Sequence, residues 1–487
     1  MKKLYILLLI VASIFIFKEF ADFNINYSPK EIKTGINYNT VDILEKNTNV
    51  LSPSEIKYEE TKDKIAYESD IPRRMKTSGY WISKIKDPDK IVLSKKAIAD
   101  FNFKNSQVAK GITDLEKYPQ VISKEILQKT FNDTLEWYKN RNYFKENGEI
   151  ISPNFYITLV SKINLNKNKL IKIRYAITTH YNDVRIFPTK EKVLSGSASK
   201  DIDRLQEESI DMGTPILVLC QTKDKVWSYV VTKTEEGWIE TKNLAFTNRN
   251  YFVNWLKAKD FVVVTEEKAD IFKDKKVLDF VDYVRMGSKF PYYPEEKYKN
   301  SYVIKIPTRD KNGFLKFSKA FINKKDVHIG YMDYTQRYVL KLAFKYLNEP
   351  YGWGGSGGEQ DCSGYLSQIF NCFGITLPET STQKIKCGKV ISFQKTDTNE
   401  LKTASIIKKG VAGISFIYLP GHIMLYLGKE NGVPYIIHAI WGVTSYDSQN
   451  NRTVNYINKV IVSDLNIGEE VAGNSLIDRV SKFNIIK

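Results

Sequence analysis

The chain has 487 residues, of which 42% are hydrophobic and 13% aromatic, and its net charge is +17 from 73 basic and 56 acidic side chains. This composition excludes a disordered protein, and the length favours about three domains. The positive charge favours an anionic partner, but the chain has no nucleic-acid recognition motif, so we do not expect nucleic acid as a partner.

The N-terminus carries a targeting pattern. Lys2 and Lys3 precede an uncharged apolar run over residues 4–17, which is short for a membrane span and typical of a signal-peptide core. No small-x-small cleavage site follows, so residues 1–18 are predicted to be either a signal peptide or a retained N-terminal anchor. Residues 19–70 are rich in Asn, Lys, Glu and Tyr with weak periodicity, which predicts a spacer.

Residues 71–154 are predicted to form a helical packing domain. Leu127, Phe131, Leu135 and Tyr138 recur at helical spacing after Ser123, a plausible N-cap. No chemistry is expected in this segment.

Residues 155–330 show the pattern of short strands. Strands are predicted at 156–161, 216–220, 227–232 and 237–239, because these runs are β-branched or aromatic and lie between turn residues. Met212-Gly213, Trp227 and Gly237-Trp238 together resemble a bacterial SH3-like barrel. A weaker version of this pattern follows at Met286-Gly287, 302–306 and 313–315. We therefore predict two small barrels, over 155–250 and 251–330.

The glycine-rich stretch 351–365 is the main candidate for chemistry. It lies between a predicted helix over 335–347 and a second one that begins near Cys362 and ends at Gly374. A thiol in the first turn of a helix faces unpaired N–H groups and the positive end of the dipole, so the pKa of Cys362 is expected to fall. The chain has four cysteines, too few for a disulfide scaffold and without zinc spacing; Cys220 and Cys372 are interpreted as core residues.

Two of the four histidines lie in a predicted hairpin over 420–439. If residues 428–432 form the loop, His422 lies opposite His438 on one face, close enough for one ring to orient the other. A two-residue turn at Asn431-Gly432 would place the rings on opposite faces. We expect the five-residue loop, because only that register gives a base with an orienting partner.

These residues resemble the NlpC/P60 cysteine peptidases of bacterial cell walls. The matching elements are Pro350-Tyr351, 353–355, Asp361-Cys362-Ser363-Gly364, Gly421-His422, 426–428 and 437–439. The resemblance implies an α+β fold with a papain-like catalytic domain over 331–487, in which Cys362 is the nucleophile, His422 the general base and His438 the residue that orients it. Val411-Ala412-Gly413 and the polar segment 384–409 depart from the family pattern and leave one wall of the cleft undefined.

The resemblance also implies a substrate and a location. The expected reaction is hydrolysis of the γ-D-glutamyl–diamino acid bond in peptidoglycan stem peptides that begin with a free L-Ala, without cofactor or metal. Asp361, Ser363 and Tyr351, with Glu207 or Glu208 from the first barrel, are the candidate substrate-binding residues; Glu208 is our choice, and a solvated loop is the alternative for these acids. An exported protein of the cell envelope is expected, with an anionic wall or membrane surface as further partner. A non-catalytic wall-binding protein and an acyltransferase on the same core are the competing functions.

Overall fold

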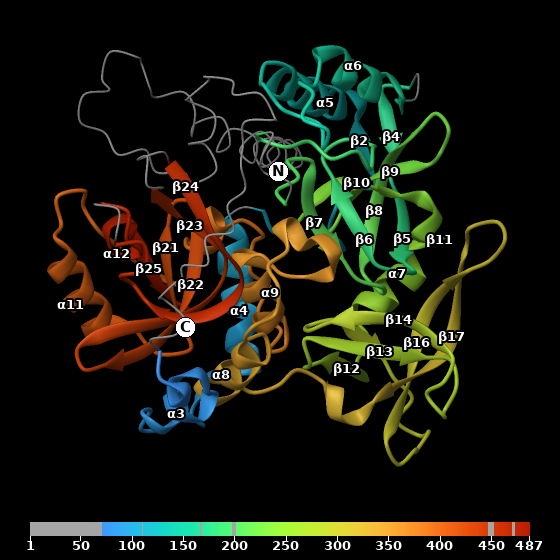
Figure 1. Cartoon of the computed structure of the whole chain (residues 1–487). Helices are drawn as coiled ribbons and strands as arrows, with labels where there is room; N and C mark the ends of the chain where they lie inside the picture. The colour runs from blue at the N-terminus through green and yellow to red at the C-terminus, as the bar shows by residue number, and fades with distance from the viewer. Residues whose placement is uncertain (1–70, 110, 166–167, 197–200, 447–451, 470–472) are drawn as a thin grey trace.

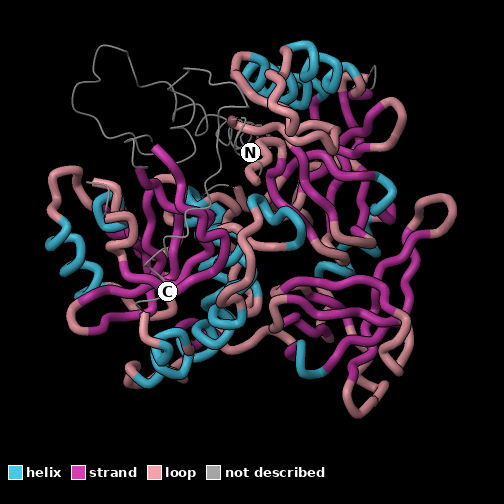
Figure 2. The backbone as a smooth tube through the Cα atoms, in the orientation of Figure 1, coloured by secondary structure: helices cyan, strands magenta, loops and turns pink. Residues whose placement is uncertain are grey.

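The computed structural model describes residues 71–487 except 110, 166–167, 197–200, 447–451 and 470–472. The predicted signal or anchor over 1–18 and the spacer over 19–70 lie outside the described residues. Within the described part, no helix combines the length and apolarity needed to cross a membrane. Helices and strands are mixed throughout the described residues, as the predicted α+β class requires. A C-terminal sheet with its helices lies beside two groups of strands (Figure 1; Figure 2).

The first described residues are mainly helical. The elements are η2 (Arg73–Lys76), α3 (Ser78–Ser83), β1 (Ile91–Leu93), α4 (Lys95–Val108), β2 (Val121–Ser123), α5 (Lys124–Lys139) and α6 (Pro153–Ser161). The predicted helix after Ser123 is confirmed as α5, and the Ser123 side chain accepts from the backbone N–H of Glu125. The predicted strand at 156–161 is wrong, because these residues form α6. Pro153 starts this helix, since its fixed φ and missing N–H suit the first turn.

The helices of residues 71–154 pack on two different cores. Trp81 of α3 is fully buried in the C-terminal core, where its ring centroid lies 5.5 Å from that of Tyr435. Phe131 of α5 instead packs on Tyr229 and Trp238 of the first strand group, at 4.9 and 5.6 Å between centroids. The predicted helical segment therefore supports both the C-terminal unit and the first strand group.

The first strand group, which we call the first β unit, follows α6. Its elements are β3 (Ile163–Asn164), β4 (Leu170–Lys172), β5 (Arg174–Thr178), β6 (Asn182–Arg185), β7 (Gln206–Ile210), β8 (Pro215–Thr222), β9 (Trp227–Val231), β10 (Glu236–Glu240), η3 (Thr241–Asn243), β11 (Leu244–Thr247) and α7 (Arg249–Leu256). The main sheet has the order β11-β5-β8-β9-β10-β6-β7, with β3 beside β8. The strands predicted at 216–220, 227–232 and 237–239 are found as β8, β9 and β10.

The second β unit covers residues 261–329. Its elements are β12 (Phe261–Val264), β13 (Lys268–Phe272), β14 (Phe280–Arg285), β15 (Lys289–Pro291), β16 (Ser301–Arg309), β17 (Leu315–Asn323), η4 (Lys324–Asp326) and β18 (Val327–Ile329). They form one sheet of order β15-β12-β18 and another of order β14-β13-β17-β16. The strand predicted at 302–306 lies within β16, and Leu315 of the run predicted at 313–315 begins β17.

The C-terminal unit is a sheet covered by helices. Its elements are β19 (Tyr334–Thr335), α8 (Gln336–Lys345), η5 (Trp353–Gly358), α9 (Cys362–Asn371), α10 (Ser381–Lys384), β20 (Lys389–Ser392), α11 (Asn399–Lys409), β21 (Ser415–Leu419), β22 (His422–Glu430), β23 (Val433–Tyr446), β24 (Arg452–Asp464), α12 (Leu476–Arg479) and β25 (Lys482–Ile485). The sheet order is β20-β25-β21-β22-β23-β24. The two helices predicted around the glycine-rich stretch are confirmed as α8 and α9.

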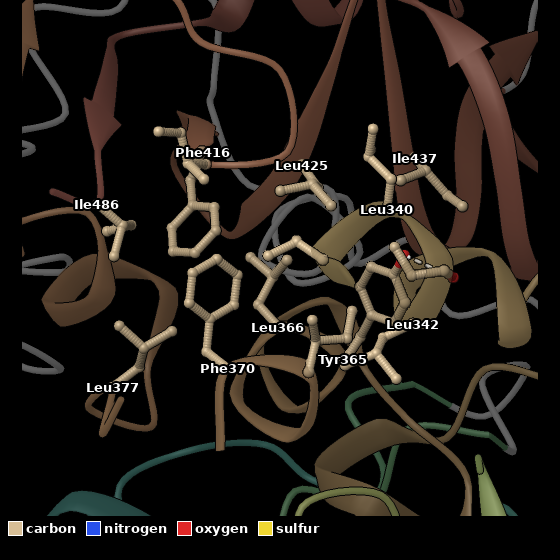
Figure 3. Close-up of a cluster of buried hydrophobic side chains, with 14 of the residues drawn as sticks. Leu340, Leu342, Tyr365, Leu366, Phe370, Leu377, Phe416, Leu425, Ile437 and Ile486 are labelled. Carbon is tan, nitrogen blue, oxygen red and sulfur yellow. Dashed lines mark hydrogen bonds between the residues drawn. The ribbon is translucent and has the colours of Figure 1, made fainter. Parts of the chain in front are cut away.

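The core of this unit lies between α8, α9 and the sheet. Phe370 of α9 meets Phe416 of β21 edge to face, with ring centroids 5.0 Å apart (Figure 3). Leu366 on the same helix points toward the strands that carry Leu425 and Ile437 (Figure 3). Packing of apolar side chains along α9 thus fixes the helix against β22 and β23, which carry the two histidines of interest.

Candidate active site

Cys362 is the first residue of α9, as expected. The Asp361 side chain caps this helix, and its Oδ1 accepts from the backbone N–H groups of Ser363 and Gly364 at 2.8 and 2.7 Å. The preceding η5 segment turns through left-handed φ values at Gly354 and Gly355, which a residue with a Cβ rarely adopts. The glycine-rich stretch therefore lets the chain turn sharply into the helix that presents the thiol.

The expected fall in the pKa of Cys362 is wrong. The residue is only 7% exposed, and burial raises the pKa of its thiol to about 12, with the Asp361 carboxylate acting in the same direction. The backbone N–H of Ile423 and the ammonium group of Lys384 oppose this rise without overcoming it. Burial therefore outweighs the positive helix end, and the thiol is neutral near pH 7.

His422 and His438 form a hydrogen-bonded pair. His422 Nε2 lies 2.7 Å from His438 Nδ1, and His438 Nε2 lies 3.2 Å from Ser463 Oγ. The Ser463 hydroxyl donates to the carbonyl oxygen of Asp464, so it accepts from His438 Nε2–H. His438 Nδ1 must then be the acceptor and His422 Nε2–H the donor. This assignment leaves the Nδ1 lone pair of His422 free to take a proton.

Both rings are neutral in the folded protein. Burial lowers the pKa of His422 to about 3, and the charge of Arg479 contributes to this shift. His438 is fully buried, and burial together with the neighbouring His422 lowers its pKa well below the usual value. A neutral pair of this kind can accept and return a proton during a reaction while carrying no charge at rest.

The hairpin reaches this arrangement by a register that differs from the expected one. Glu430 pairs with Val433, so the turn is the two-residue Asn431-Gly432, and the predicted five-residue loop is wrong. Both turn residues have positive φ, which the favoured two-residue hairpin turns require.

A β-bulge between Tyr426 and Gly428 then shifts the register by one residue. Because Leu425 pairs with Ile437, His438 lies opposite Met424, and His422 lies diagonally from it on the same face. The bulge thus places both histidines on one face of the sheet. In a regular hairpin with this turn they would lie on opposite faces.

The structure brings the thiol to the same strand. Cys362 lies against the backbone N–H of Ile423, the residue that follows His422 at the start of β22. A helix N-terminus, a neutral thiol and a neutral imidazole with an oriented proton therefore meet at one place. This arrangement can carry out nucleophilic attack with proton transfer to the imidazole.

The predicted substrate-binding residues lie around the start of α9. Burial raises the pKa of Tyr351 well above its usual value, and Asp361 and Cys362 add to this shift, which places the phenol beside both. Ser363 is buried, and its hydroxyl donates to the carbonyl oxygen of Glu379, so it holds the main chain there.

Glu208 reaches the same place from the first β unit. Its Oε1 accepts from the backbone N–H of Ser209 at 2.8 Å, and its Oε2 lies 3.9 Å from the position that a Cβ on Gly364 would take. Burial raises the pKa of Glu208, with the charge of Glu379 as the next cause. Glu207 also faces Glu379, and burial with this neighbour raises the pKa of Glu207 to about 7. Both acids lie in strand β7, and Glu208 is buried there, so the solvated-loop alternative does not hold for Glu208.

Two further acceptors were missed from the sequence. Glu379 is buried and its carboxyl group is in hydrogen-bonding contact with that of Glu208. Gln360 is 3% exposed and lies in the same cluster, with its Oε1 3.0 Å from the position of a Cβ on Gly364. Among the described residues this Oε1 has no hydrogen-bond partner. An acid in a loop is usually solvated, so nothing in the spacing of Glu379 marked it. An amide oxygen without a donor, beside two carboxyl groups that repel each other when both are ionised, suits a bound cation.

Metal ligation and the other cysteines add little to this site. Within the residues that the structure describes, no group of three or more His, Cys, Asp or Glu side chains is arranged to hold a metal ion. Cys372 is buried and donates its S–H to the carbonyl oxygen of Val264, and Cys220 lies in β8, so both predicted core residues are placed in packed elements.

Comparison with known proteins agrees with this geometry. Residues 348–462 match the model of the NlpC/P60 family, and residues 194–240 match that of an SH3 domain of the SH3b1 type. The bifunctional muramidase/DL-endopeptidase CwlT of Bacillus subtilis is 32% identical over 108 residues, which are 22% of this chain and 32% of that protein. The gamma-D-glutamyl-L-lysine dipeptidyl-peptidase of the same organism is 27% identical over 143 residues, which are 28% of this chain and 48% of that protein.

The chain thus spans less than half the length of either of these relatives. Among solved structures, an NlpC/P60 endopeptidase from Photobacterium damselae subsp. piscicida has a TM-score of 0.69 at 22% identity, covering 84% of this chain and 96% of that one. This likeness extends well beyond the C-terminal unit and concerns the fold.

Proposed function

We infer that this chain, which contains an NlpC/P60 domain and an SH3b domain, is a cysteine peptidase that hydrolyses peptidoglycan stem peptides. The observation that carries the proposal is the 2.7 Å contact between His422 and His438 beside a thiol at the start of α9. Cys362 is the nucleophile, His422 the general base and His438 the residue that orients it.

The proposed mechanism begins with a neutral thiol. Cys362 Sγ attacks the scissile carbonyl while His422 Nδ1 takes the thiol proton, and backbone N–H groups at the helix start stabilise the oxyanion. The His422 imidazolium then protonates the leaving amine, which departs and leaves a thioester. Water, activated by His422, releases the acyl product. Because the pKa of Cys362 is raised to about 12 and that of His422 lowered to about 3, proton transfer accompanies the attack rather than preceding it.

The proposed bond joins the γ-carboxyl of D-glutamate to a diamino acid, in peptides with a free N-terminal L-Ala. Glu208 and Asp361 supply carboxylates near the thiol, and Tyr351 lies beside Asp361 and Cys362. The unpartnered Gln360 Oε1 and the Glu379 carboxyl group increase the excess of acceptors there. A substrate ammonium would satisfy these acceptors and offset their mutual repulsion.

The proposed location is the cell envelope. Residues 1–18 would direct export or serve as an anchor, and the net charge of +17 would favour an anionic wall or membrane surface.

The direct test is product analysis by mass spectrometry with a synthetic L-Ala-γ-D-Glu-diamino acid peptide. The proposal predicts the L-Ala-D-Glu dipeptide and the free diamino acid with the wild-type protein, and neither with Cys362→Ala. Lysis of purified peptidoglycan that survives Cys362→Ala would contradict the proposal. A product in which the acyl group is joined to an added amine instead of released by water would indicate an acyltransferase.

A further inference from the structure

A single buried arginine connects the second β unit to the first. Arg285, the last residue of β14, is 1% exposed. Its Nε lies 3.1 Å from both carboxylate oxygens of Asp211, while Nη1 donates to Ser209 Oγ at 2.6 Å and Nη2 to the Ser209 carbonyl oxygen at 2.9 Å. A buried guanidinium with donors in a rigid fork holds its partners in one geometry.

Ser209 passes this constraint to the candidate active site. Its backbone N–H donates to Glu208 Oε1 at 2.8 Å, which fixes the carboxylate that faces α9. Its Oγ accepts from Arg285 and donates to the carbonyl oxygen of Gly355 at 3.1 Å. One hydroxyl therefore joins the second β unit to the glycine-rich turn that precedes Cys362.

The glycine-rich turn is held closely against β7. The carbonyl oxygen of Gly354 accepts from Gln206 Nε2 at 2.9 Å, and that of Gly355 also accepts from the Tyr181 hydroxyl at 2.9 Å. A Cβ on Gly355 would overlap Ser209 Oγ, so the approach depends on glycine. The backbone N–H of Gly354 lies 3.4 Å from Asp361 Oδ2, which links the turn to the cap of the catalytic helix.

We propose that Arg285 is a positioning residue which, through Ser209, holds Glu208 and the glycine-rich turn in the geometry that recognises the substrate. The second β unit thereby sets substrate affinity and selectivity without touching the substrate. This inference rests on the proposed function, since it concerns how the same site recognises a peptide with a free amino group. The guanidinium also lies 5.4 Å from the ring centroid of Tyr181, so it stabilises a second donor to the turn.

The test uses Ser209→Ala and Arg285→Lys in the full chain. Ser209→Ala removes the shared hydroxyl with little change in volume, and Arg285→Lys keeps the charge but loses the fork. Each is expected to raise KM for a free L-Ala peptide about tenfold, with kcat within about twofold, and to reduce the preference over the N-acetylated peptide by a similar factor. Amide hydrogen exchange at residues 353–360 is expected to become faster in both variants.

Lys345→Met is the matched control. Lys345 of α8 also binds the second β unit, donating to the Thr265 carbonyl oxygen at 2.8 Å and pairing with Glu266, and neither of these contacts involves β7 or the turn. This variant is expected to leave both the selectivity and the exchange at 353–360 unchanged.

Two outcomes would overturn the positioning role. One is wild-type KM, selectivity and exchange in Ser209→Ala, a variant that we expect to fold even if Arg285→Lys does not. The other is an equal effect of Lys345→Met. Failure of the proposed function has a different signature, namely no peptide cleavage by the wild type, and the hydrogen-exchange comparison then decides the positioning role.

Discussion

Ser463 determines which nitrogen of His422 can act as a base. Its hydroxyl donates to the Asp464 carbonyl oxygen and must accept from His438, which sets the tautomers of both rings. The sequence indicates the two histidines but not this serine, because a hydroxyl on a neighbouring strand has no motif of its own. The proton path therefore depends on a residue that the spacing of the chain does not indicate.

Ser463→Ala should reduce catalysis more than binding. Without its acceptor, His438 Nε2 no longer needs the proton, and the pair can adopt the tautomer that leaves His422 unable to accept one. We expect kcat to fall about 10- to 100-fold with KM nearly unchanged in steady-state peptide hydrolysis. Ser463→Thr, which keeps the hydroxyl, should retain most of the activity. Equal activity of the alanine and threonine variants would contradict the assigned tautomers.

Acid should destabilise the protein through its buried histidines. An unfolded histidine titrates near pH 6.5, whereas the pKa of His422 is lowered to about 3 and that of His438 is also lowered. Between these pH values the unfolded state binds more protons, so the free energy of unfolding falls as pH decreases, by up to about 1.4 kcal/mol per pH unit for each histidine.

A carboxyl group with a raised pKa has the opposite effect on the pH dependence of stability. The pKa of Glu207 is raised from 4.5 to about 7. Between these pH values the folded state binds more protons than the unfolded state, so the contribution of Glu207 to stability increases as pH falls through this range. Urea unfolding at pH 7 and pH 5 of the wild type and His438→Asn therefore isolates the histidine effect. The variant should lose less stability on acidification, and an equal loss would contradict neutral burial of His438.

At the level of elements, the glycine-rich turn should tolerate alanine at Gly357 much better than at Gly355. Gly355 and Gly357 both have left-handed φ values, of 73° and 70°, so alanine at either costs about 1 kcal/mol of stability. Only at position 355 would the new Cβ also meet Ser209, because no atom of the described residues lies within 4 Å of a Cβ at 357.

Gly355→Ala should therefore raise KM for the peptide well above the value in Gly357→Ala, which serves as the control for backbone strain. Thermal unfolding of both variants, with steady-state kinetics, checks this difference. The same KM in both variants would mean that close contact between the turn and β7 has no role in binding.

Helices α5, α8 and α9 and strands β8, β9 and β10 follow from the sequence because caps, glycines and apolar spacing agree there with the final packing. Two features did not follow. Residues 156–161 have strand-like composition, yet Pro153 and contact with the first β unit make them helical. The bulge between Tyr426 and Gly428 offsets the two-residue turn, and no local pattern distinguishes these compensating changes from a longer loop.

At the level of the whole molecule, the segment that carries α3 completes the core of the C-terminal unit. Trp81 is fully buried in that core, and its Nε1 donates to the Met75 carbonyl oxygen at 2.7 Å. The sequence predicts a packing domain over 71–154 but does not indicate which unit each helix supports, since periodicity indicates an apolar face and not its partner.

Trp81→Ala should thus destabilise the C-terminal unit although it lies more than 250 residues before Cys362 in the chain. Loss of a fully buried indole typically costs about 3–5 kcal/mol, which chemical denaturation with a probe in the C-terminal unit can measure. Tyr251→Ala, at an aromatic side chain that is 56% exposed, is the control and should change stability little. A loss for Trp81→Ala as small as for this control would contradict the shared core.

The central claim is that Cys362 forms a thioester with the acyl part of the substrate. Intact-protein mass spectrometry after acid quenching of the reaction with an L-Ala-γ-D-Glu-diamino acid peptide tests it most directly. We predict a mass increase equal to the L-Ala-D-Glu acyl group, located on Cys362 by digestion and absent in Cys362→Ala. Product formation in Cys362→Ala, or an acyl group attached to another residue, would contradict the claim.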